Sequence, residues 1–257
     1  MGNRGERIIS LAPSVTKILF DLGLEENVVA VTRWCRDLVD VGSRKQLGDC
    51  WHTDAEEIAR LQPDIVIGCI PYGEGVIESI VRKGLRFLAL YPQTLSDVKK
   101  DILLLGAMLD RKERAENIVR IMEEEIQKVQ ERAKNLPKKP RVYCEEWPKP
   151  IIPASQWVRE MVEIAGGIPV PAQRGKNMAM PEEIIIRENP EIIILHWCGA
   201  GEKSRPKVIY SRPGWESVDA VKTKKVFSIP DYYLNSPGPN LIEGLKILSH
   251  IIHQAIS

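Results

Sequence analysis

Apolar and polar positions alternate in two patterns along the first part of the chain. Short apolar runs, typical of buried strands, are separated by stretches in which apolar residues recur every three or four positions, as on one face of a helix. The pattern predicts strands at 7–13, 28–34, 64–70 and 85–91, and helices at 14–24, 54–63 and 76–84. We expect Ser14 and Asp54 to cap the first two helices. This alternation indicates parallel strands joined by crossover helices.

The middle of the chain, residues 96–135, shows no strand pattern. We expect Asp110 to break this stretch. After it, "RKERAENIVRIMEEEIQKVQERAKNL" (111–136) places apolar residues a few positions apart and fills the other face with charges. This spacing predicts one helix of about seven turns. Its length and its place in the chain predict a strut between two lobes.

The strand and helix alternation then begins again. The pattern predicts strands at 141–147, 191–197 and 225–230, and helices at 155–167, 181–190 and 240–256, with Pro181 in the first turn of its helix. Both halves place a related motif before a buried strand, "QPDIVIG" at 62–68 and "NPEIIIL" at 189–195. We therefore predict an α/β fold of two Rossmann-like lobes, with mostly parallel sheets, one long backbone helix and a ligand cleft between the lobes. The predicted domains are an N-terminal lobe at 1–109, a bridging helix at 110–136 and a C-terminal lobe at 137–257.

Aromatic residues gather where the predicted strands end. In open parallel sheets, ligands bind outside the carboxyl ends of the strands. Of the six tryptophans, all but one lie in or beside the loops at those ends, and several tyrosines join them. Such a concentration indicates an aromatic-lined cleft that suits a large, flat, partly apolar ligand.

Composition narrows the function classes. The chain has 257 residues, of which 44% are hydrophobic and 28% charged, with a net charge of +1. These values are typical of a globular protein and give no sign of a nucleic-acid partner. No apolar run reaches the ~18 residues of a membrane span, and no signal-peptide pattern precedes the first strand. The chain as it stands is therefore expected in the cytoplasm, or outside it if a leader has been removed.

Cysteine usage gives no disulfide framework. The five cysteines are odd in number and lack paired spacing, so we expect free thiols.

Several stretches resemble a known family. They are "RIISLAPSVTKILFDLGL", the pattern W-x-T-D-x-E-x-I-x-x-L-x-P-D-I-V-I at 51–67, the midchain helix, "EMVEIAGG" and "SPGPNLIEGLKIL". On these motifs the chain is similar to the helical-backbone substrate-binding proteins of ABC transporters. Within that group it resembles the vitamin B12 (cobalamin) and iron-siderophore binders, over nearly the whole chain.

The resemblance implies two α/β lobes joined by a rigid helix, little hinge closure and aromatic side chains that clasp the ligand. Trp51 matches a cobalamin-contacting tryptophan of the family, and Tyr72 and Tyr232 are the next best matches. The resemblance also implies an ABC permease as partner, which the family contacts through a surface glutamate on each lobe. The matching candidates here are Glu74 or Glu78 in the first lobe and Glu202 in the second.

We therefore expect a monomeric binding protein for a corrinoid, with no catalysis and no required cofactor. A ferric siderophore or haem in the same cleft is the alternative. An anionic siderophore complex needs arginines, and only Arg33, Arg36 and Arg174 are candidates, which favours the corrinoid. The predicted ligand-binding residues are Trp34, Arg36, Trp51, Tyr72, Glu146, Trp147, Trp157, Trp197, Tyr232 and Tyr233.

A metal-ion site is a further hypothesis. His52 and His196 are its predicted ligands, joined by Cys50, Cys198 or Glu146, because imidazole and thiolate bind zinc and iron well. One of these histidines or a cysteine is also a candidate axial ligand to a bound cobalt or iron. The chain has no CxxC or HExxH spacing, which weakens the case for a bare metal site.

An enzyme is the remaining hypothesis. Cys144 beside Glu145 and Glu146, or Cys198 near His196, supplies a nucleophile and a base. Neighbouring residues in a strand point to opposite faces, so such pairs rarely meet. No Gly-rich phosphate loop is present either, since "GCIPYGEG" lacks the Lys-Ser/Thr of a P-loop. We therefore expect no enzyme.

Overall fold

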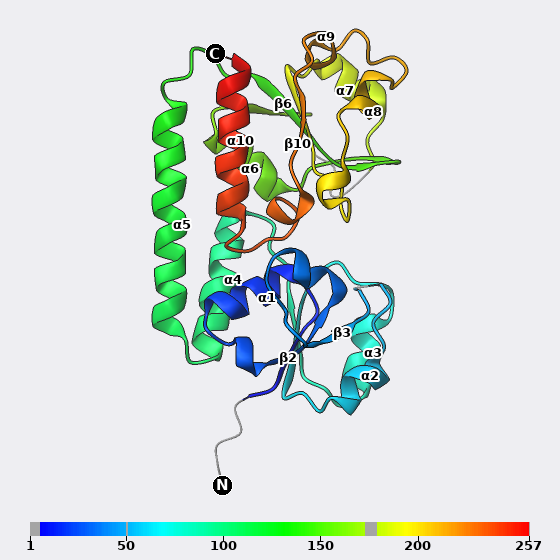
Figure 1. Ribbon diagram of the computed structural model, residues 1–257, viewed down its shortest axis with the longest axis vertical. Helices are drawn as coiled ribbons and strands as arrows, with labels where there is room; N and C mark the ends of the chain where they lie inside the picture. Colours follow the sequence, from blue (N-terminus) through cyan, green and yellow to red (C-terminus); the bar gives the residue numbers. More distant parts are fainter. Residues whose placement is uncertain (1–5, 50, 173–178, 257) are drawn as a thin grey trace. The chain divides into compact units, whose positions relative to one another are not determined.

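The computed structural model describes residues 6–49, 51–172 and 179–256 (Figure 1). The chain forms two compact units, Met1–Pro92 with Ser96–Arg120 and Gln93–Leu95 with Ile121–Ser257. Each unit is built on its own sheet with helices around it, and both sheets are mostly parallel. These observations confirm the predicted α/β fold class. The boundary between the units falls inside the 22-residue helix α5 (Lys112–Ala133), which is the predicted long helix.

The sheet of the first unit is entirely parallel. Its strands lie in the order β3 (Lys45–Leu47), β2 (Val28–Thr32), β1 (Ile8–Ser10), β4 (Ile65–Cys69) and β5 (Phe87–Leu90). The helices of this part of the chain are α1 (Pro13–Asp21), α2 (Ala55–Arg60), α3 (Val76–Arg82) and α4 (Leu95–Met108). Ile9 and Val66 face one side, where they pack with Ile58 of α2 and Ile80 of α3. Because side chains alternate along a strand, the opposite side is left for α1, which contacts β1, β2 and β4.

The sheet of the second unit is mixed. Its order is β10 (Val226–Ser228), β9 (Ile192–Leu195), β6 (Arg141–Pro148) and β7 (Ile151–Pro153), and β8 (Ile168–Val170) pairs with the beginning of β6. Among the described strands of this sheet, only β7 runs antiparallel. The helices are α6 (Gln156–Ile164), α7 (Glu182–Glu188), α8 (Lys207–Tyr210), α9 (Asp219–Lys222) and α10 (Leu241–Ile256).

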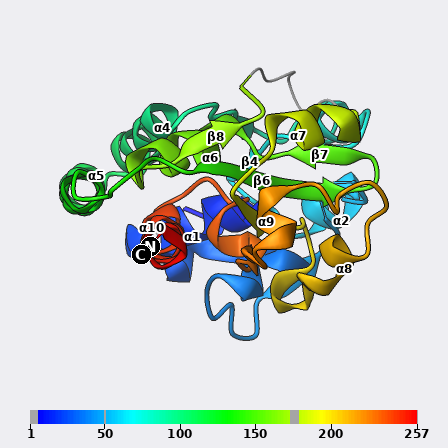
Figure 2. The ribbon, with the colours of Figure 1, turned by 90° about the horizontal axis from the view of Figure 1, so that it is seen from above.

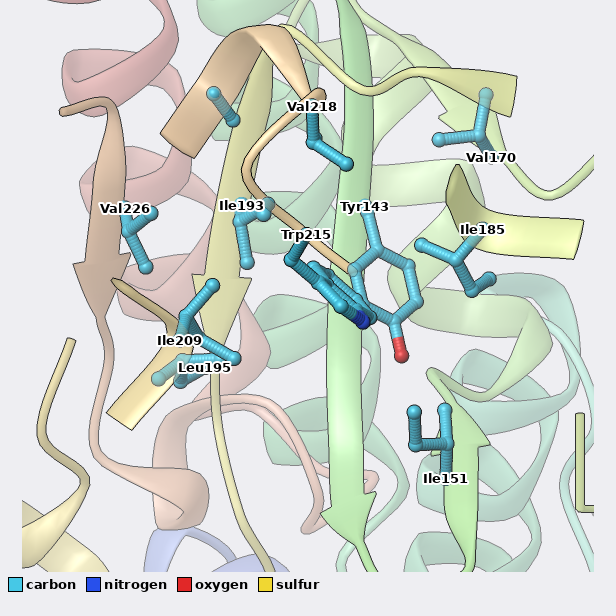
Figure 3. Close-up of a cluster of buried hydrophobic side chains, with 11 residues drawn as sticks. Tyr143, Ile151, Val170, Ile185, Ile193, Leu195, Ile209, Trp215, Val218 and Val226 are labelled. Atoms are coloured by element: carbon cyan, nitrogen blue, oxygen red, sulfur yellow. The ribbon is translucent and has the colours of Figure 1, made fainter. Parts of the chain in front are cut away.

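One core cluster of the second unit lies between this sheet and α7, α8 and α9. Tyr143 of β6 and Trp215 are both fully buried in it, with ring centroids 6.1 Å apart (Figure 3). Helix α6 lies on the other side of β6 from α9 (Figure 2). Helix α10 contacts α6, and its Lys246 forms a 2.9 Å ion pair with Glu125 of α5 (Figure 1).

The related motifs found in the sequence have the same structural role in both units. Arg7 donates from its backbone amide to Asp64 (2.7 Å), and Arg141 donates in the same way to Glu191 (3.0 Å). The Arg7 guanidinium also donates to the carbonyl of Gln62 (3.1 Å), and the Arg141 guanidinium to the carbonyl of Asn189 (2.9 Å). Both accepting residues precede the motif proline and have a positive φ, 47° at Gln62 and 45° at Asn189. The motif thus ties the start of the central strand to the start of its neighbour.

Most predicted helix boundaries agree with the structure. Asp54 caps α2, since its side chain accepts from the backbone amide of Glu56 at 2.9 Å. Asp110 separates α4 from α5 in a left-handed conformation (φ 57°), which confirms the predicted break.

Two details of the helix starts were predicted wrongly. Ser14 does not cap α1, because the helix begins one residue earlier at Pro13 and Ala12 occupies the cap without a side-chain hydrogen bond. The fixed φ of proline suits the first helical position, so the helix starts there. Conversely, Pro181 is the cap of α7 and does not lie in its first turn. The pattern also missed β3, β7 and β8, whose three residues each are too few to show a period.

Within the described ranges, no helix combines the length and the apolarity needed to cross a membrane. Cys35, Cys69, Cys144 and Cys198 are free thiols. Cys50 and Arg174, which the sequence analysis considered as a metal ligand and as a ligand-site cation, lie outside the described residues.

Candidate functional site

The first sheet has its topological switch point between β1 and β4. The chain moves from β1 to β2 and β3 on one side and then returns to β4 and β5 on the other. Open α/β sheets bind ligands at the carboxyl ends of the strands beside such a point. Tyr72 lies there, because its hydroxyl donates to the carbonyl of Leu11 just after β1, at 3.4 Å. Its ring packs edge-on against Phe87, with centroids 5.7 Å apart.

Gly68 makes the position of Tyr72 possible. A Cβ at Gly68 would lie 1.7 Å from the hydroxyl oxygen of Tyr72 and 2.6 Å from its ring. The ring therefore rests directly over the strand backbone, at a place where any larger residue would displace it.

We expect Gly68→Ala to lower the free energy of unfolding by about 1–3 kcal/mol, because the tyrosine ring must leave its position. Urea denaturation checks this loss. In a Tyr72→Ala background the same substitution should cost under about 1 kcal/mol, since the atoms that clash are gone. An equal loss in both backgrounds would mean that the glycine is needed for another reason.

A buried carboxylate anchors the loop that carries Trp51. The side chain of Asp49, 7% exposed, accepts from Arg33 Nη2 (2.5 Å), His52 Nδ1 (2.8 Å) and the backbone amide of Trp51 (3.1 Å). Burial acts to raise the pKa of Asp49, but hydrogen bonds from His52 and the Trp51 amide, with the Arg33 charge, hold it below its usual value. The acid is therefore ionised at neutral pH and keeps this loop in place.

The predicted aromatic residues of the first unit are accessible at this edge. The side chain of Trp51 is 57% exposed and that of Trp34 is 37% exposed, high values for such large apolar groups. The guanidinium of Arg33 lies over the Trp34 ring, 4.7 Å from its centroid. Arg36 is exposed in the same short helix, η2 (Arg33–Asp37).

In the second unit, two loops at the carboxyl ends of β9 and β10 are joined to each other. Asp231 accepts from the backbone amides of Gly199 (2.8 Å) and Gly201 (2.7 Å). Asn235 donates to the carbonyl of His196 at 2.9 Å. The loop "HWCGAG" is therefore held against the loop that contains Tyr232 and Tyr233, whose ring centroids lie 4.6 Å apart.

The geometry around His196 determines its protonation state. The Asn235 amide nitrogen donates to the His196 carbonyl, so the oxygen of that amide faces the ring, 2.5 Å from Nδ1. An amide oxygen only accepts, so Nδ1 carries the proton and Nε2 does not. The side chain is fully buried, and burial lowers the pKa of His196 to about 4. His196 is therefore neutral at physiological pH and holds the loop through Asn235.

A second buried carboxylate, Glu145, was considered only as the base of an enzyme pair and was absent from the predicted ligand-binding residues. It lies within β6 opposite Leu195, the last residue of β9, where the second sheet has its own switch point. Its oxygens accept from Trp197 Nε1 (2.9 Å), from Tyr143 (2.9 Å) and from both terminal nitrogens of Arg212 (2.8 and 2.9 Å). An acidic residue inside the apolar pattern "RVYCEEW" was the available signal, because a buried charge needs partners. The sequence carried no signal that Arg212 is the partner, since Arg212 is 67 residues away from Glu145.

The remaining predicted residues of this unit have mixed surroundings. Glu146 accepts from the backbone amide of Ser155 at 3.1 Å, at the start of α6. Trp157, half-buried, donates to the carbonyl of Leu234 at 2.8 Å and so supports the Tyr232 loop. Trp147 is 42% exposed on the β6–β7 hairpin.

The two histidines of the hypothesised metal site have other partners in the structure. Among them, no group of three or more His, Cys, Asp or Glu side chains lies close enough together to hold a metal ion. His52 instead bonds Asp49, and His196 is enclosed beside Asn235.

The hypothesised pair of Cys144 and Glu145 lacks the chemistry it needs. Burial raises the pKa of Cys144 to about 12, so that thiol is not a thiolate at neutral pH. Glu145 beside it is already occupied by Arg212, Trp197 and Tyr143.

Comparison with known proteins gives a consistent result. A family model described as "Periplasmic binding protein" matches residues 8–233. An uncharacterised ABC transporter substrate-binding lipoprotein of Bacillus subtilis, YvrC, is 27% identical, over 96% of this chain and 80% of that protein. A vitamin B12-binding protein of Vibrio parahaemolyticus is 25% identical, over 93% of this chain and 86% of that protein. The periplasmic heme-binding protein RhuT of Roseiflexus has the same fold, with a TM-score of 0.85 at 23% identity and coverage of 98% and 100%.

Proposed function

Because the chain belongs to the periplasmic binding protein family, we propose that its ligand is a corrinoid of the vitamin B12 type. The chain is a substrate-binding protein of the ABC import type, and members of that class carry a small-molecule ligand to a permease. The finer proposal is that the ligand is a corrinoid. It rests on the side chains at the carboxyl ends of the strands in both sheets and on the likeness to a vitamin B12-binding protein.

The observation that carries the proposal is the aromatic residue at the switch point of each sheet. Tyr72 lies beside the ends of β1 and β4, and Trp197 follows β9 beside β6. Exposed or half-buried rings surround both places, among them Trp51 and Tyr232. A corrinoid offers a large, flat and partly apolar surface, which aromatic side chains bind well.

Two of the arginines at these edges favour a ligand without strong negative charge. Arg33 is paired with Asp49, and Arg212 is paired with Glu145, so neither guanidinium is available as an unpaired positive charge. An anionic ligand such as a ferric siderophore binds best to unpaired guanidinium groups. Haem and ferric siderophores remain the alternatives, since the fold is shared with a heme-binding protein.

Titration of the purified protein with cyanocobalamin tests the proposal, with hemin and a ferric siderophore in parallel. We expect one cyanocobalamin per chain, retained after desalting and seen by its absorbance. Trp51→Ala should weaken binding by about tenfold, the loss of one stacking ring. Tyr210→Ala is the matched control, because Tyr210 is an exposed ring on α8 and should leave the affinity unchanged.

Two other outcomes contradict the corrinoid. Binding of hemin or of the siderophore more tightly than cyanocobalamin would identify that molecule as the ligand. Failure to retain any macrocycle, with zinc or iron bound instead and lost in His196→Ala, would move the function to a metal site.

The partner that the family implies is an ABC permease. Glu74 and Glu202 are exposed, whereas Glu78 is engaged with Arg82 at 2.7 Å. We therefore place the permease contacts of this proposal on Glu74 and Glu202, and we propose that the protein acts as a monomer.

A further inference from the structure

The buried Glu145 carboxylate has a full set of hydrogen-bond donors. Its side chain is fully buried, and it accepts four hydrogen bonds within 2.9 Å from three residues. Three of these donor groups belong to Tyr143 and Arg212, which are themselves buried or nearly so. The fourth donor is the indole N–H of Trp197, which is half-buried.

The pair of Glu145 and Arg212 is held by contacts on both sides. The guanidinium binds both carboxylate oxygens and lies over the ring of Trp215, 4.6 Å from its centroid. Trp215 is held in turn by a 2.8 Å hydrogen bond from its Nε1 to Glu182. Figure 3 shows Trp215 beside Tyr143, whose hydroxyl oxygen points toward the end of β6. A bidentate pair fixed on both sides has little freedom to follow a moving partner.

Trp197 is consequently held at two places. Part of its ring packs against the apolar core of the second unit, and its N–H is bound by Glu145 Oε1. The backbone on either side is also fixed, because the His196 amide donates to the Glu145 carbonyl and the Cys198 amide to the Glu146 carbonyl, both at 3.0 Å. The exposed part of the indole therefore has one orientation before any ligand arrives.

We propose that Glu145, held by Arg212, is a positioning residue that presents the indole of Trp197 to the bound macrocycle. This inference rests on the proposed function. It contrasts with Trp51, where Asp49 binds the backbone amide and leaves the indole 57% exposed. The second unit thus offers a pre-organised ring, which lowers the entropy lost on binding.

A double-mutant cycle tests the link between Glu145 and Trp197. Glu145→Gln should weaken cyanocobalamin binding by about tenfold, since it removes the charge that holds the indole N–H. In a Trp197→Phe background, which lacks that N–H, the same substitution should have no further effect on the dissociation constant. An equal weakening in both backgrounds would overturn the proposal. If Glu145→Gln does not fold, Glu145→Asp takes its place. The shorter side chain keeps the negative charge but moves the carboxylate oxygens away from the Trp197 N–H, so the same weakening is expected.

A ligand-free measurement separates this inference from the proposed function. In protein labelled with 5-fluorotryptophan, the fluorine resonance of Trp197 is assigned by its loss in Trp197→Phe. Glu145→Gln should shift, broaden or split that resonance even if cyanocobalamin does not bind. An unchanged Trp197 resonance would overturn the positioning role.

Glu182→Gln is the matched control. It removes the negative charge from the acceptor of the Trp215 N–H in the same core, and that carboxylate bonds Trp215 and not Trp197. It should perturb the Trp215 resonance and lower stability, while the Trp197 resonance and the affinity for cyanocobalamin remain unchanged. A loss of affinity equal to that of Glu145→Gln would indicate a purely structural role for the cluster and would also overturn the proposal.

Discussion

Replacing Arg212 with methionine should lower the free energy of unfolding by about 3–5 kcal/mol. The substitution leaves the carboxylate of Glu145, which is fully buried, without its bidentate partner. Burial acts to lower the pKa of Arg212, but its hydrogen bonds and ion pair with Glu145 raise it above the ordinary value. The guanidinium is therefore charged at every accessible pH, and its loss is the loss of a full charge. Urea denaturation at neutral pH measures the effect.

Two variants show whether the loss comes from the unpaired charge. Lys222→Met breaks an exposed pair with Asp219 (3.8 Å) and should cost at most about 1 kcal/mol. The double variant Arg212→Met with Glu145→Leu should recover part of the stability, because it removes the stranded charge but also takes the acceptor from the buried Tyr143 hydroxyl. If the double variant were as unstable as Arg212→Met, lost packing against Trp215 and not the stranded carboxylate would be the cause.

The second large effect is a dependence of stability on pH that comes from His196. Its pKa is about 4 in the folded protein and 6.5 in an unfolded chain. Above pH 6.5 both states hold the ring neutral, so the contribution to stability is fully present. As the pH falls from 6.5 toward 4, the unfolded chain binds a proton that the folded protein refuses. Stability should therefore decrease by about 3 kcal/mol over this window.

The comparison with His196→Gln isolates this contribution. Asp101 acts in the opposite direction over the same range, since burial and then the nearby Asp97 raise its pKa to about 6. The folded protein binds that proton more readily, so Asp101 adds stability as the pH falls below 6. Urea denaturation measures the free energy of unfolding between pH 7 and pH 4. As the pH falls, this free energy should decrease less for His196→Gln than for the unmodified protein, or should increase. Parallel profiles would show that His196 is not buried as a neutral ring.

Elements with several repeats of a period were predictable. The strands at 64–70 and 191–197, the helix at 240–256 and the long helix after Asp110 each show enough apolar positions to define their type. The three-residue strands β3, β7 and β8 were not predictable from the sequence, because pairing with the neighbouring strands makes them extended. The position of the candidate site at the carboxyl ends of the strands followed from the alternation itself.

What the sequence by itself determined is the order of the elements and the placing of aromatic residues such as Tyr72 and Trp197 at the ends of parallel strands. These features depend on local periodicity, which neighbouring residues encode. Only the tertiary structure decided the pairing of Glu145 with Arg212 across 67 residues, and the tautomer of His196 through Asn235, 39 residues away. Such contacts depend on which buried polar groups the packed core brings together, because each must find a partner once water is excluded.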